Sequence, residues 1–229
     1  MTHCLSAIRR LGQGATSMED AAGRVVAFLY DLFRDEQGTP QCVLVRLFKV
    51  CRYDHLPPGL QDRARGHGPA PSDDMACLTL MATRGIDEAW NDRHRSRGHQ
   101  VIPLPDEQAI KRLPMLARLI QQLGFARSDV LQTDGEIFIE HAQEDYNVFH
   151  VDPARDSPHI PDQDDFVVPY GVRSVVGLGG ILPDNALFAV IMFSRVSVPR
   201  NTAELIAPLA MGVKMALLPF WGADRTFSG

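Results

Sequence analysis

The sequence predicts an α+β fold in which an antiparallel sheet is covered by helices. The strand-like segments come in two groups, 42–50 with 77–83 and 172–182 with 186–194, and strands that are close in sequence favour hairpins over βαβ crossovers. Amphipathic helical patterns stand near both ends of the chain. With 229 residues, of which 45% are hydrophobic and 22% charged, the chain has enough apolar side chains for a sizeable core.

The first two elements are a helix at 17–34 and a central strand at 42–50. Ser17 and Asp20 have the spacing of a capping box, with Asp in place of Glu, and apolar residues then recur at helical spacing. The strand reads CVLVRLFKV, which is almost free of polar alternation. Such a run is typical of a strand that is buried on both faces.

The second strand, at 77–83, ends at Gly85 and follows a connection rich in proline and glycine, in which residues 60–64 have room for a short helix. An insertion of helices and loops then extends from about 84 to 165. Pro114 should kink its first helix or divide it in two. The elements expected in the insertion are a strand at 101–104, a helix at 106–123 and a helix at 135–146.

The last elements are a hairpin and a closing helix. Residues 172–182 and 186–194 are apolar strands joined by a Pro-Asp-Asn turn. A helix over 202–218 follows, capped by Asn201 or Thr202, and carries apolar residues on one face. The chain is therefore expected to divide into an N-terminal extension at 1–16, one domain at 17–220 and a frayed C-terminal tail at 221–229.

Composition and charge narrow the class of partner. A net charge of −5 offers no basic surface to a nucleic acid. The run at 178–192 is apolar but interrupted by glycine, proline and polar residues, and residues 1–13 lack the long apolar segment of a secretion signal. The four cysteines form no CxxC pair and have no zinc-type spacing. We expect a cytoplasmic protein that binds neither nucleic acid nor a membrane.

Several phrases of the sequence resemble the GAF family of small-molecule sensor domains. The segment YGVRSVVG at 170–177 and the segment LFAVIM at 187–192 are similar to the last two strands of a GAF sheet. The chain also resembles an uncharacterised GAF-like input region found ahead of PAS and histidine-kinase modules in bacteria, through four further phrases at 44–49, 89–93, 146–151 and 166–171.

The resemblance implies a GAF-like sheet with the terminal helices on one face and the insertion over the other, above a ligand pocket. In that family the helices opposite the pocket often build a dimer. A homodimer through the terminal helices is therefore expected, with Met211, Met215 and Trp221 at or near the seam. Because the sequence ends at the closing helix, its output would pass through a separate protein such as a histidine kinase.

Candidate ligand-binding residues are polar and aromatic side chains that the insertion and the later strands would bring over the sheet. Arg46 stands inside an apolar strand, where its charge must either pair with a carboxylate of the chain, the commoner solution, or meet a ligand. Small-molecule sites combine apolar walls with a few polar groups of this kind. The candidates are Arg46, Trp90, Asn91, His94, His99, Tyr146, His150, Tyr170 and Arg173.

Other motifs indicate specific cofactors more weakly. The loop DSPHIP at 156–161 resembles a phytochrome loop, but no Cys-His pair stands near it, so no bilin is expected. His150 could be the axial ligand of a haem, although a histidine hydrogen-bonded at a strand edge is commoner. The glycines at 177–180 lack the lysine and the following helix of a phosphate loop, and instead suit a bulge or close packing in a strand.

Two functions from different classes are the main candidates, beside a haem-binding gas or redox sensor and a protein-interaction scaffold whose pocket is filled by side chains. The first is a non-enzymatic, small-molecule-sensing or regulatory signalling domain, in which ligand occupancy biases the packing of the terminal helices. The second is a thiol-dependent reductase of methionine sulfoxide, as in some GAF-fold enzymes, with Cys51 and Cys77 as the nucleophile and the resolving thiol if their strands adjoin. Because buried cysteines more often pack as small hydrophobes, the sensor is preferred.

Overall fold

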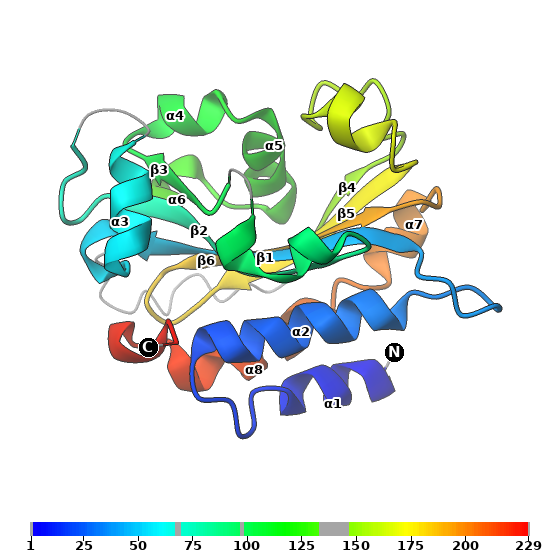
Figure 1. The fold of residues 1–229 in the computed structure, drawn as a ribbon, viewed down its shortest axis with the longest axis horizontal. Helices are drawn as coiled ribbons and strands as arrows, with labels where there is room; N and C mark the ends of the chain where they lie inside the picture. Colours follow the sequence, from blue (N-terminus) through cyan, green and yellow to red (C-terminus); the bar gives the residue numbers. More distant parts are fainter. Residues whose placement is uncertain (1, 67–69, 97–98, 133–146, 229) are drawn as a thin grey trace.

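The computed structural model describes residues 2–66, 70–96, 99–132 and 147–228, which form a six-stranded sheet with every strand pair antiparallel (Figure 1). The strand order is β3-β2-β1-β6-β5-β4. The strands are β1 (Cys42–Arg52), β2 (Ala76–Gly85), β3 (Val101–Leu104), β4 (Val148–Val151), β5 (Ser174–Ile181) and β6 (Leu187–Ser194).

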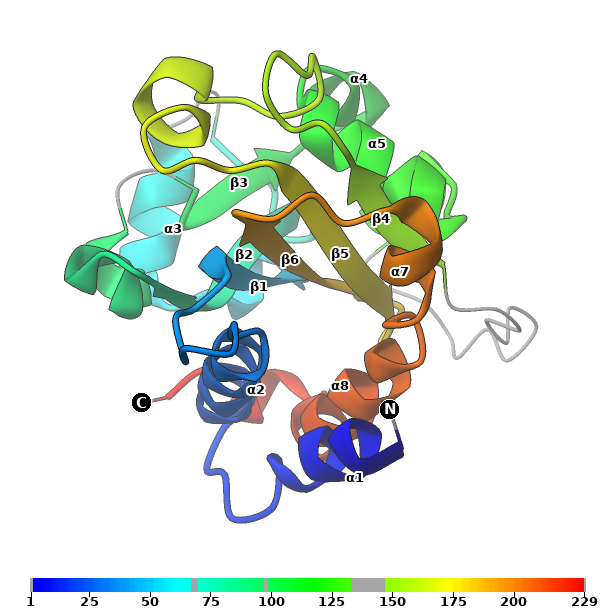
Figure 2. The ribbon, with the colours of Figure 1, turned by 90° about the vertical axis from the view of Figure 1, so that its right-hand side faces the viewer.

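Helices cover both faces of this sheet, which confirms the predicted α+β architecture. Figures 1 and 2 show α1, α2 and α8 below one face, and α3 to α6 with the loop at 152–172 on the other side. The helices are α1 (Thr2–Arg10), α2 (Met18–Leu32), α3 (Pro58–Arg65), α4 (Glu107–Lys111), α5 (Pro114–Leu123), α6 (Arg127–Leu131), α7 (Arg200–Glu204) and α8 (Leu209–Leu217).

The central position of β1 explains its unbroken apolar run. It pairs with β2 on one side and with β6 on the other, and all but two of its residues are buried. The predicted hairpin of β5 and β6 is also confirmed, with Ile181 opposite Leu187 at its closed end. Asn185 in the turn has a φ of 60°, a left-handed conformation that Asn adopts more readily than most residues.

The helix layer follows the apolar spacing of α2. Ser17 is the N-cap, and its hydroxyl accepts from the Asp20 amide at 3.1 Å, as the capping-box spacing predicts. Val25 and Leu29 are fully buried in the core between α2 and the sheet. The N-terminal extension forms α1, which packs on α8, where a side chain on Gly12 would overlap the Ala216 carbonyl oxygen. The C-terminal tail is not frayed, because Thr226 is buried and Phe227 packs against the core.

The insertion builds a second core on the opposite face. Its helices contribute Ile110, Leu119 and Val130, which pack with residues of the sheet. The predicted helix at 106–123 is divided at Pro114, which is the first residue of α5. Helix α6 was not predicted, and the predicted helix at 135–146 lies outside the described residues.

The closing helix differs from the prediction at its start and in its continuity. It begins after Pro199, not at an Asn201 or Thr202 cap, because proline at that position presets a helical entry and Asn201 instead accepts from the Thr202 amide. It is then interrupted before Pro208, whose missing N–H cannot continue the α7 hydrogen bonds. The stretch Arg200–Phe220 has the length and mean hydropathy of a membrane span, yet half of its richest window is buried, as in a core helix.

Candidate functional site

Arg46 projects from the middle of β1 toward the insertion. Its neighbours Val45 and Leu47 belong to the core below the sheet, and side chains alternate along a strand, so Arg46 points the other way. Its Nη2 donates to the Ser96 hydroxyl of the insertion at 3.3 Å. Its Nε is buried and has no hydrogen-bond partner among the described residues. The guanidinium is therefore fixed at one end and unsatisfied at the other.

The charge of Arg46 is poorly compensated. Burial lowers the pKa of Arg46, and the nearby carboxylate of Asp162 only partly opposes this effect. No carboxylate in the described part of the chain comes within the 4.0 Å of an ion pair with this guanidinium. The ion pair of Arg46 with a carboxylate of the chain, which the sequence favours, is therefore not formed among the described residues. The alternative that Arg46 meets an anionic ligand stays a prediction.

Thr83 adds a second unsatisfied group beside Arg46. The two residues are cross-strand partners on β2 and β1, and Thr83 is 6% exposed. Its Oγ1 has no hydrogen-bond partner among the described residues. Since both Arg46 Nε and a threonine hydroxyl can donate, one oxyanion between them would satisfy both. Sequence reasoning missed Thr83, because threonine is ordinary in a strand and only the register places it opposite the arginine.

Trp90 belongs to an aromatic cluster on the same face. Its ring centroid is 4.8 Å from that of Tyr170 and 5.6 Å from that of Phe166, and Phe166 in turn is 5.0 Å from Phe193 of β6. The Trp90 ring also covers Gly85, where an added Cβ would come within 2.8 Å of its Cε3 atom. These rings fill space that the sequence predicts as an open pocket, so the cluster forms a packed wall.

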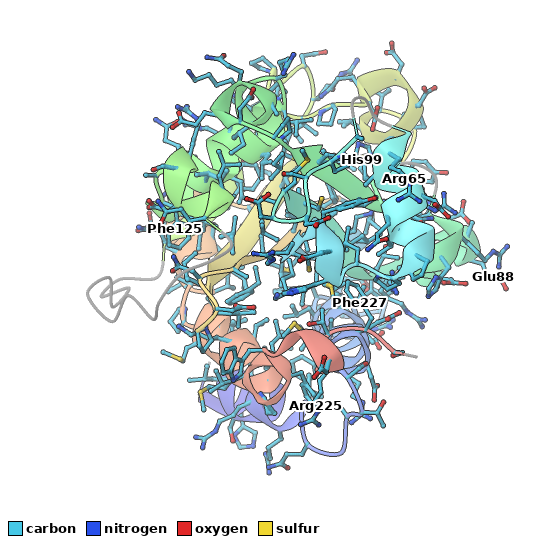
Figure 3. The ribbon with its side chains drawn as sticks, turned by 90° about the vertical axis from the view of Figure 1, so that its left-hand side faces the viewer. Arg65, Glu88, His99, Phe125, Arg225 and Phe227 are labelled. Atoms are coloured by element: carbon cyan, nitrogen blue, oxygen red, sulfur yellow. The ribbon has the colours of Figure 1, made fainter. Side chains whose placement is uncertain are left out.

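The other predicted site residues are distributed around this wall. Asn91 lies beside Trp90, and its Oδ1 accepts from the Gly85 amide at 2.8 Å, which is a structural role at the end of β2. The side chains of His94, His99 and Arg173 are exposed and do not join the ring cluster (Figure 3 labels His99). Tyr146 lies outside the described residues. The structure thus brings together Trp90, Asn91 and Tyr170, and holds Arg46 with Thr83 and Ser96.

His150 on β4 is held by the backbone. Its Nε2 lies 2.6 Å from the Val198 carbonyl oxygen, and its amide donates to Gln122 Oε1 at 2.8 Å. This contact holds the ring at the edge of the sheet, which is the hydrogen-bonded arrangement that the strand-edge alternative predicts. A cavity of about 360 Å³ lies beside it, formed by Arg118 and the 150–159 segment. Its lining has no cysteine for bilin attachment, and the described residues hold no group of three metal-ligating side chains.

Cys51 and Cys77 face each other directly across β1 and β2, so the condition that their strands adjoin is met. Their environment, however, does not favour the thiolate form. Burial, together with the neighbouring Cys51, raises the pKa of Cys77 to about 12, and burial also raises the pKa of Cys51 despite the nearby Lys49 charge. A thiol reacts as its thiolate, so neither residue has the environment of a catalytic nucleophile.

Neither a protein-family model nor a curated protein matches the chain. Among solved structures, the phycocyanobilin-bound GAF domain of a cyanobacterial phytochrome is 15% identical with a TM-score of 0.46, covering 94% of this chain and 91% of that one. The phycoerythrobilin-bound GAF domain of a cyanobacterial phytochrome is 14% identical with a TM-score of 0.44, covering 94% and 95%. The GAF domain of the Acinetobacter phosphoenolpyruvate-protein phosphotransferase is 12% identical with a TM-score of 0.41, covering 94% and 91%.

Similarity at this level transfers no function. The fold and the site define an α+β domain whose antiparallel sheet separates a layer of terminal helices from an insertion that covers Arg46, whose buried Nε has no partner among the described residues.

Proposed function

We propose that the chain is a non-enzymatic sensory or regulatory domain that binds a small anionic molecule at Arg46. The observation that carries this proposal is the buried guanidinium whose Nε has no partner among the described residues, next to the unpaired hydroxyl of Thr83. A buried arginine without a counter-ion is costly, and a carboxylate or phosphate oxygen is the group that it recognises best. The ligand class is therefore a small carboxylate or phosphate.

The route from this site to the terminal helices is short. Ser96, which accepts from Arg46, stands three residues after Arg93, which forms an ion pair with Glu19 in the first turn of α2. The Ser228 amide donates to the same Glu19 carboxylate at 3.0 Å. A ligand that draws Arg46 away from Ser96 would act on the segment that contacts α2 and, through Glu19, the C-terminal residues, to the extent that the ligand's affinity differs between two arrangements.

Signal output through other molecules belongs to the same proposal. The apolar side chains of Leu205, just after α7, and of Met211, on α8, are exposed, and so is Trp221 after α8. These residues would support a homodimer or contact with a separate output protein such as a histidine kinase.

The test is a thermal-shift screen of small carboxylates and phosphates on the full chain. A compound that raises the midpoint temperature of unfolding should bind Arg46→Met at least tenfold more weakly than the wild type. It should bind Arg84→Met as the wild type does, because Arg84 is an exposed arginine on the same strand as Thr83. Bound ligand should also change amide hydrogen exchange at residues 17–21 and 93–96. If no anion stabilises the protein, or if every hit binds Arg46→Met equally well, the proposed function is wrong.

A further inference from the structure

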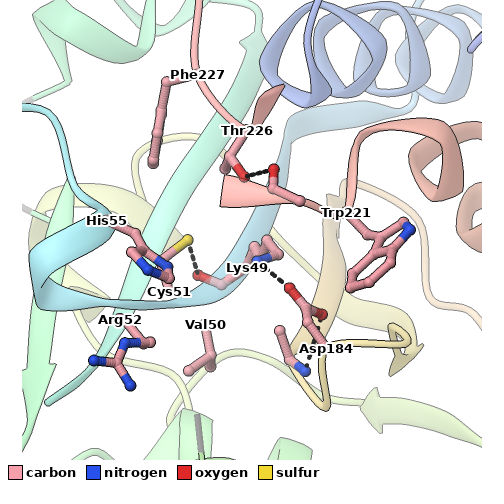
Figure 4. A pocket seen from close by; sticks show the side chains of 11 residues that line it. Lys49, Val50, Cys51, Arg52, His55, Asp184, Trp221, Thr226 and Phe227 are labelled. Atoms are coloured by element: carbon pink, nitrogen blue, oxygen red, sulfur yellow. Dashed lines mark hydrogen bonds and ion pairs between the residues drawn. The ribbon is translucent and has the colours of Figure 1, made fainter. Parts of the chain in front are cut away.

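A second cavity lies on the opposite face of the sheet from the Arg46 side chain. It has a volume of about 180 Å³ and is formed by the end of β1, the turn between β5 and β6, and the C-terminal residues (Figure 4). A water molecule occupies about 30 Å³ of liquid volume, so this space has room for about six waters or for one small organic molecule.

The floor of the cavity is a buried ammonium group. Lys49 is 5% exposed and its Nζ donates to Asp184 Oδ2 at 2.9 Å. An ammonium group has three donors, and the other two have no partner among the described residues. Burial alone would lower the pKa of Lys49, but the Asp184 carboxylate beside it favours the charged form, and the pKa is raised. Lys49 is therefore charged at neutral pH and presents two open donors to the cavity.

The other charged side chains of the lining are already engaged. Asp184 is already engaged, since its Oδ2 accepts from Lys49 and its Oδ1 accepts from the Ala186 amide at 3.3 Å. Figure 4 shows Arg52 and His55 on one side of Lys49 and Trp221 on the other. Arg52 already pairs with Asp54, since its Nη2 lies 2.9 Å from Asp54 Oδ2, so the donors that an oxyanion can meet are the open ones of Lys49.

The walls provide apolar surface for the rest of a ligand. Trp221 lines the cavity and is 44% exposed, and Phe227 and Val50 lie on other sides of it. The Thr226 hydroxyl is engaged with the Gly222 carbonyl oxygen at 3.2 Å, so it adds little polarity. A large ring left half in solvent beside a buried cation is the arrangement of a site that holds a small amphipathic molecule.

We propose that this cavity binds a small organic monocarboxylate with an apolar body. The carboxylate oxygens accept from Lys49 Nζ, and the body packs between Trp221 and Phe227. This site goes beyond the proposed function, because Lys49 and Arg46 project to opposite faces of β1 and share no lining residue.

Sodium benzoate is a suitable probe, because its ring matches the aromatic walls and its size matches the cavity. Titration into the ¹⁵N-labelled full chain should give saturable shifts at the amides of Ala186, Gly222 and Thr226, with a dissociation constant of about 0.1–1 mM. Benzamide, which has the same shape without the charge, should bind at least tenfold more weakly. Equal binding of the two compounds would overturn the proposal.

Variants separate this site from Arg46. Lys49→Met should weaken benzoate binding at least tenfold, and Trp221→Ala, at a half-exposed position, severalfold. Because Lys49→Met leaves the partly buried Asp184 without its partner, the double variant Lys49→Met/Asp184→Asn is made as well, and its fold is checked by circular dichroism. Lys111→Met, at an exposed lysine of α4, is the matched control and should bind as the wild type does.

Two results would overturn the proposal. One is the absence of saturable shifts at the three reporter amides, and the other is benzoate binding that survives both lysine-49 variants but is lost in Arg46→Met. Conversely, binding that is retained in Arg46→Met and lost in the Lys49 variants supports this site whether or not the proposed function at Arg46 holds.

Discussion

The guanidinium of Arg93 and the carboxylate of Glu19 form a two-point ion pair that joins the insertion to the first turn of α2. Arg93 Nη2 lies 2.8 Å from Glu19 Oε2, and Arg93 Nε donates to Oε1. Only 7% of the Arg93 side chain and 14% of the Glu19 side chain are exposed. The Phe227 ring lies 5.5 Å from the Arg93 guanidinium carbon, so the pair also contacts the C-terminal residues. One buried pair thus connects the two helical layers and one end of the chain.

Breaking the ion pair of Arg93 and Glu19 should destabilise the fold. Glu19→Gln is expected to lower the free energy of unfolding by about 2–3 kcal/mol at neutral pH, because it leaves the Arg93 charge buried without a counter-ion. Urea unfolding followed by circular dichroism measures the change. The matched control is Asp31→Asn, which breaks the pair of Asp31 with Arg34, where the side chains are 53% and 39% exposed. Its cost should stay below about 0.5 kcal/mol, and equal costs would contradict the special role of Arg93.

The pair also sets a pH dependence. Burial alone would raise the pKa of Glu19, but the Arg93 guanidinium, the Ser228 amide and His94 together hold it below the ordinary 4.5. A carboxyl group with a lowered folded-state pKa stabilises the protein fully above its unfolded pKa, and this contribution is lost as the pH falls through the folded value. The stability difference between wild type and Glu19→Gln should therefore shrink below about pH 4.5. A difference that is unchanged in acid would refute the assignment.

Thr83 and Thr79 offer a matched pair on one strand. Thr83→Val removes a buried hydroxyl without a partner, so it should raise the free energy of unfolding by about 1 kcal/mol. Thr79→Val removes a hydroxyl that donates to the Cys77 carbonyl oxygen at 3.1 Å, so it should lower the free energy by about 1 kcal/mol. Thermal unfolding of the two variants measures the opposite signs. Destabilisation by Thr83→Val would show that this hydroxyl already has a partner in solution.

Much of the sheet could be predicted from the sequence, because its strands are fully apolar and bounded by turn residues. The hairpin of β5 and β6 and the division of the insertion helix at Pro114 follow from local chemistry alone. The prediction of one continuous closing helix is wrong. Its apolar periodicity continues past Pro208, so the periodicity alone does not indicate the interruption between α7 and α8. The packing of α1 and of Thr226 depends on tertiary contacts that no local pattern encodes.

The candidate site was predictable only in part. Arg46 stands out as a charge in an apolar strand, and Trp90 and Tyr170 stand out as large rings near polar residues. The sequence pattern cannot show which polar groups find hydrogen-bond partners. Asn91 accepts from the Gly85 amide, His150 contacts a carbonyl oxygen, and the Thr83 hydroxyl has no partner among the described residues. Hydrogen-bond satisfaction is a property of the assembled layers, so it emerges only with the structure.

The contact of Trp90 with Gly85 should be sensitive to a single methyl group. In Gly85→Ala the new Cβ would lie 2.8 Å from Trp90 Cε3 and 2.9 Å from the Val43 carbonyl oxygen, so we expect a loss of about 2 kcal/mol in unfolding free energy. In a Trp221→Phe background, the emission of Trp90 should shift to the red. Gly23→Ala is the control, since nothing lies within 4 Å of its new Cβ and alanine favours the helix by about 0.5–1 kcal/mol. An unchanged Trp90 spectrum in Gly85→Ala would contradict the packed wall.

The accessibility of the four thiols tests the alternative that the chain is a thiol-dependent reductase. Cys42, Cys51 and Cys77 are buried, whereas Cys4 is half-buried, and burial raises the pKa of both Cys42 and Cys77 to about 12. At pH 8 a thiol with such a pKa is ionised in only about one molecule in ten thousand, and in the native state it is also shielded from the reagent. A thiol-reactive dye should therefore label one site quickly, and Cys4→Ser should remove that fast phase.

The remaining three thiols should react only as fast as the protein unfolds, which a urea series of labelling rates measures. Under the same conditions, with dithiothreitol as reductant, the wild type should not turn over methionine sulfoxide. Because Cys51 and Cys77 are directly opposed, an oxidant that reached them could pair them, and this makes the experiment decisive. Fast labelling of Cys51 in the native state, together with turnover that Cys51→Ser abolishes, would mean that the raised pKa does not govern this pair and that the chain is an enzyme.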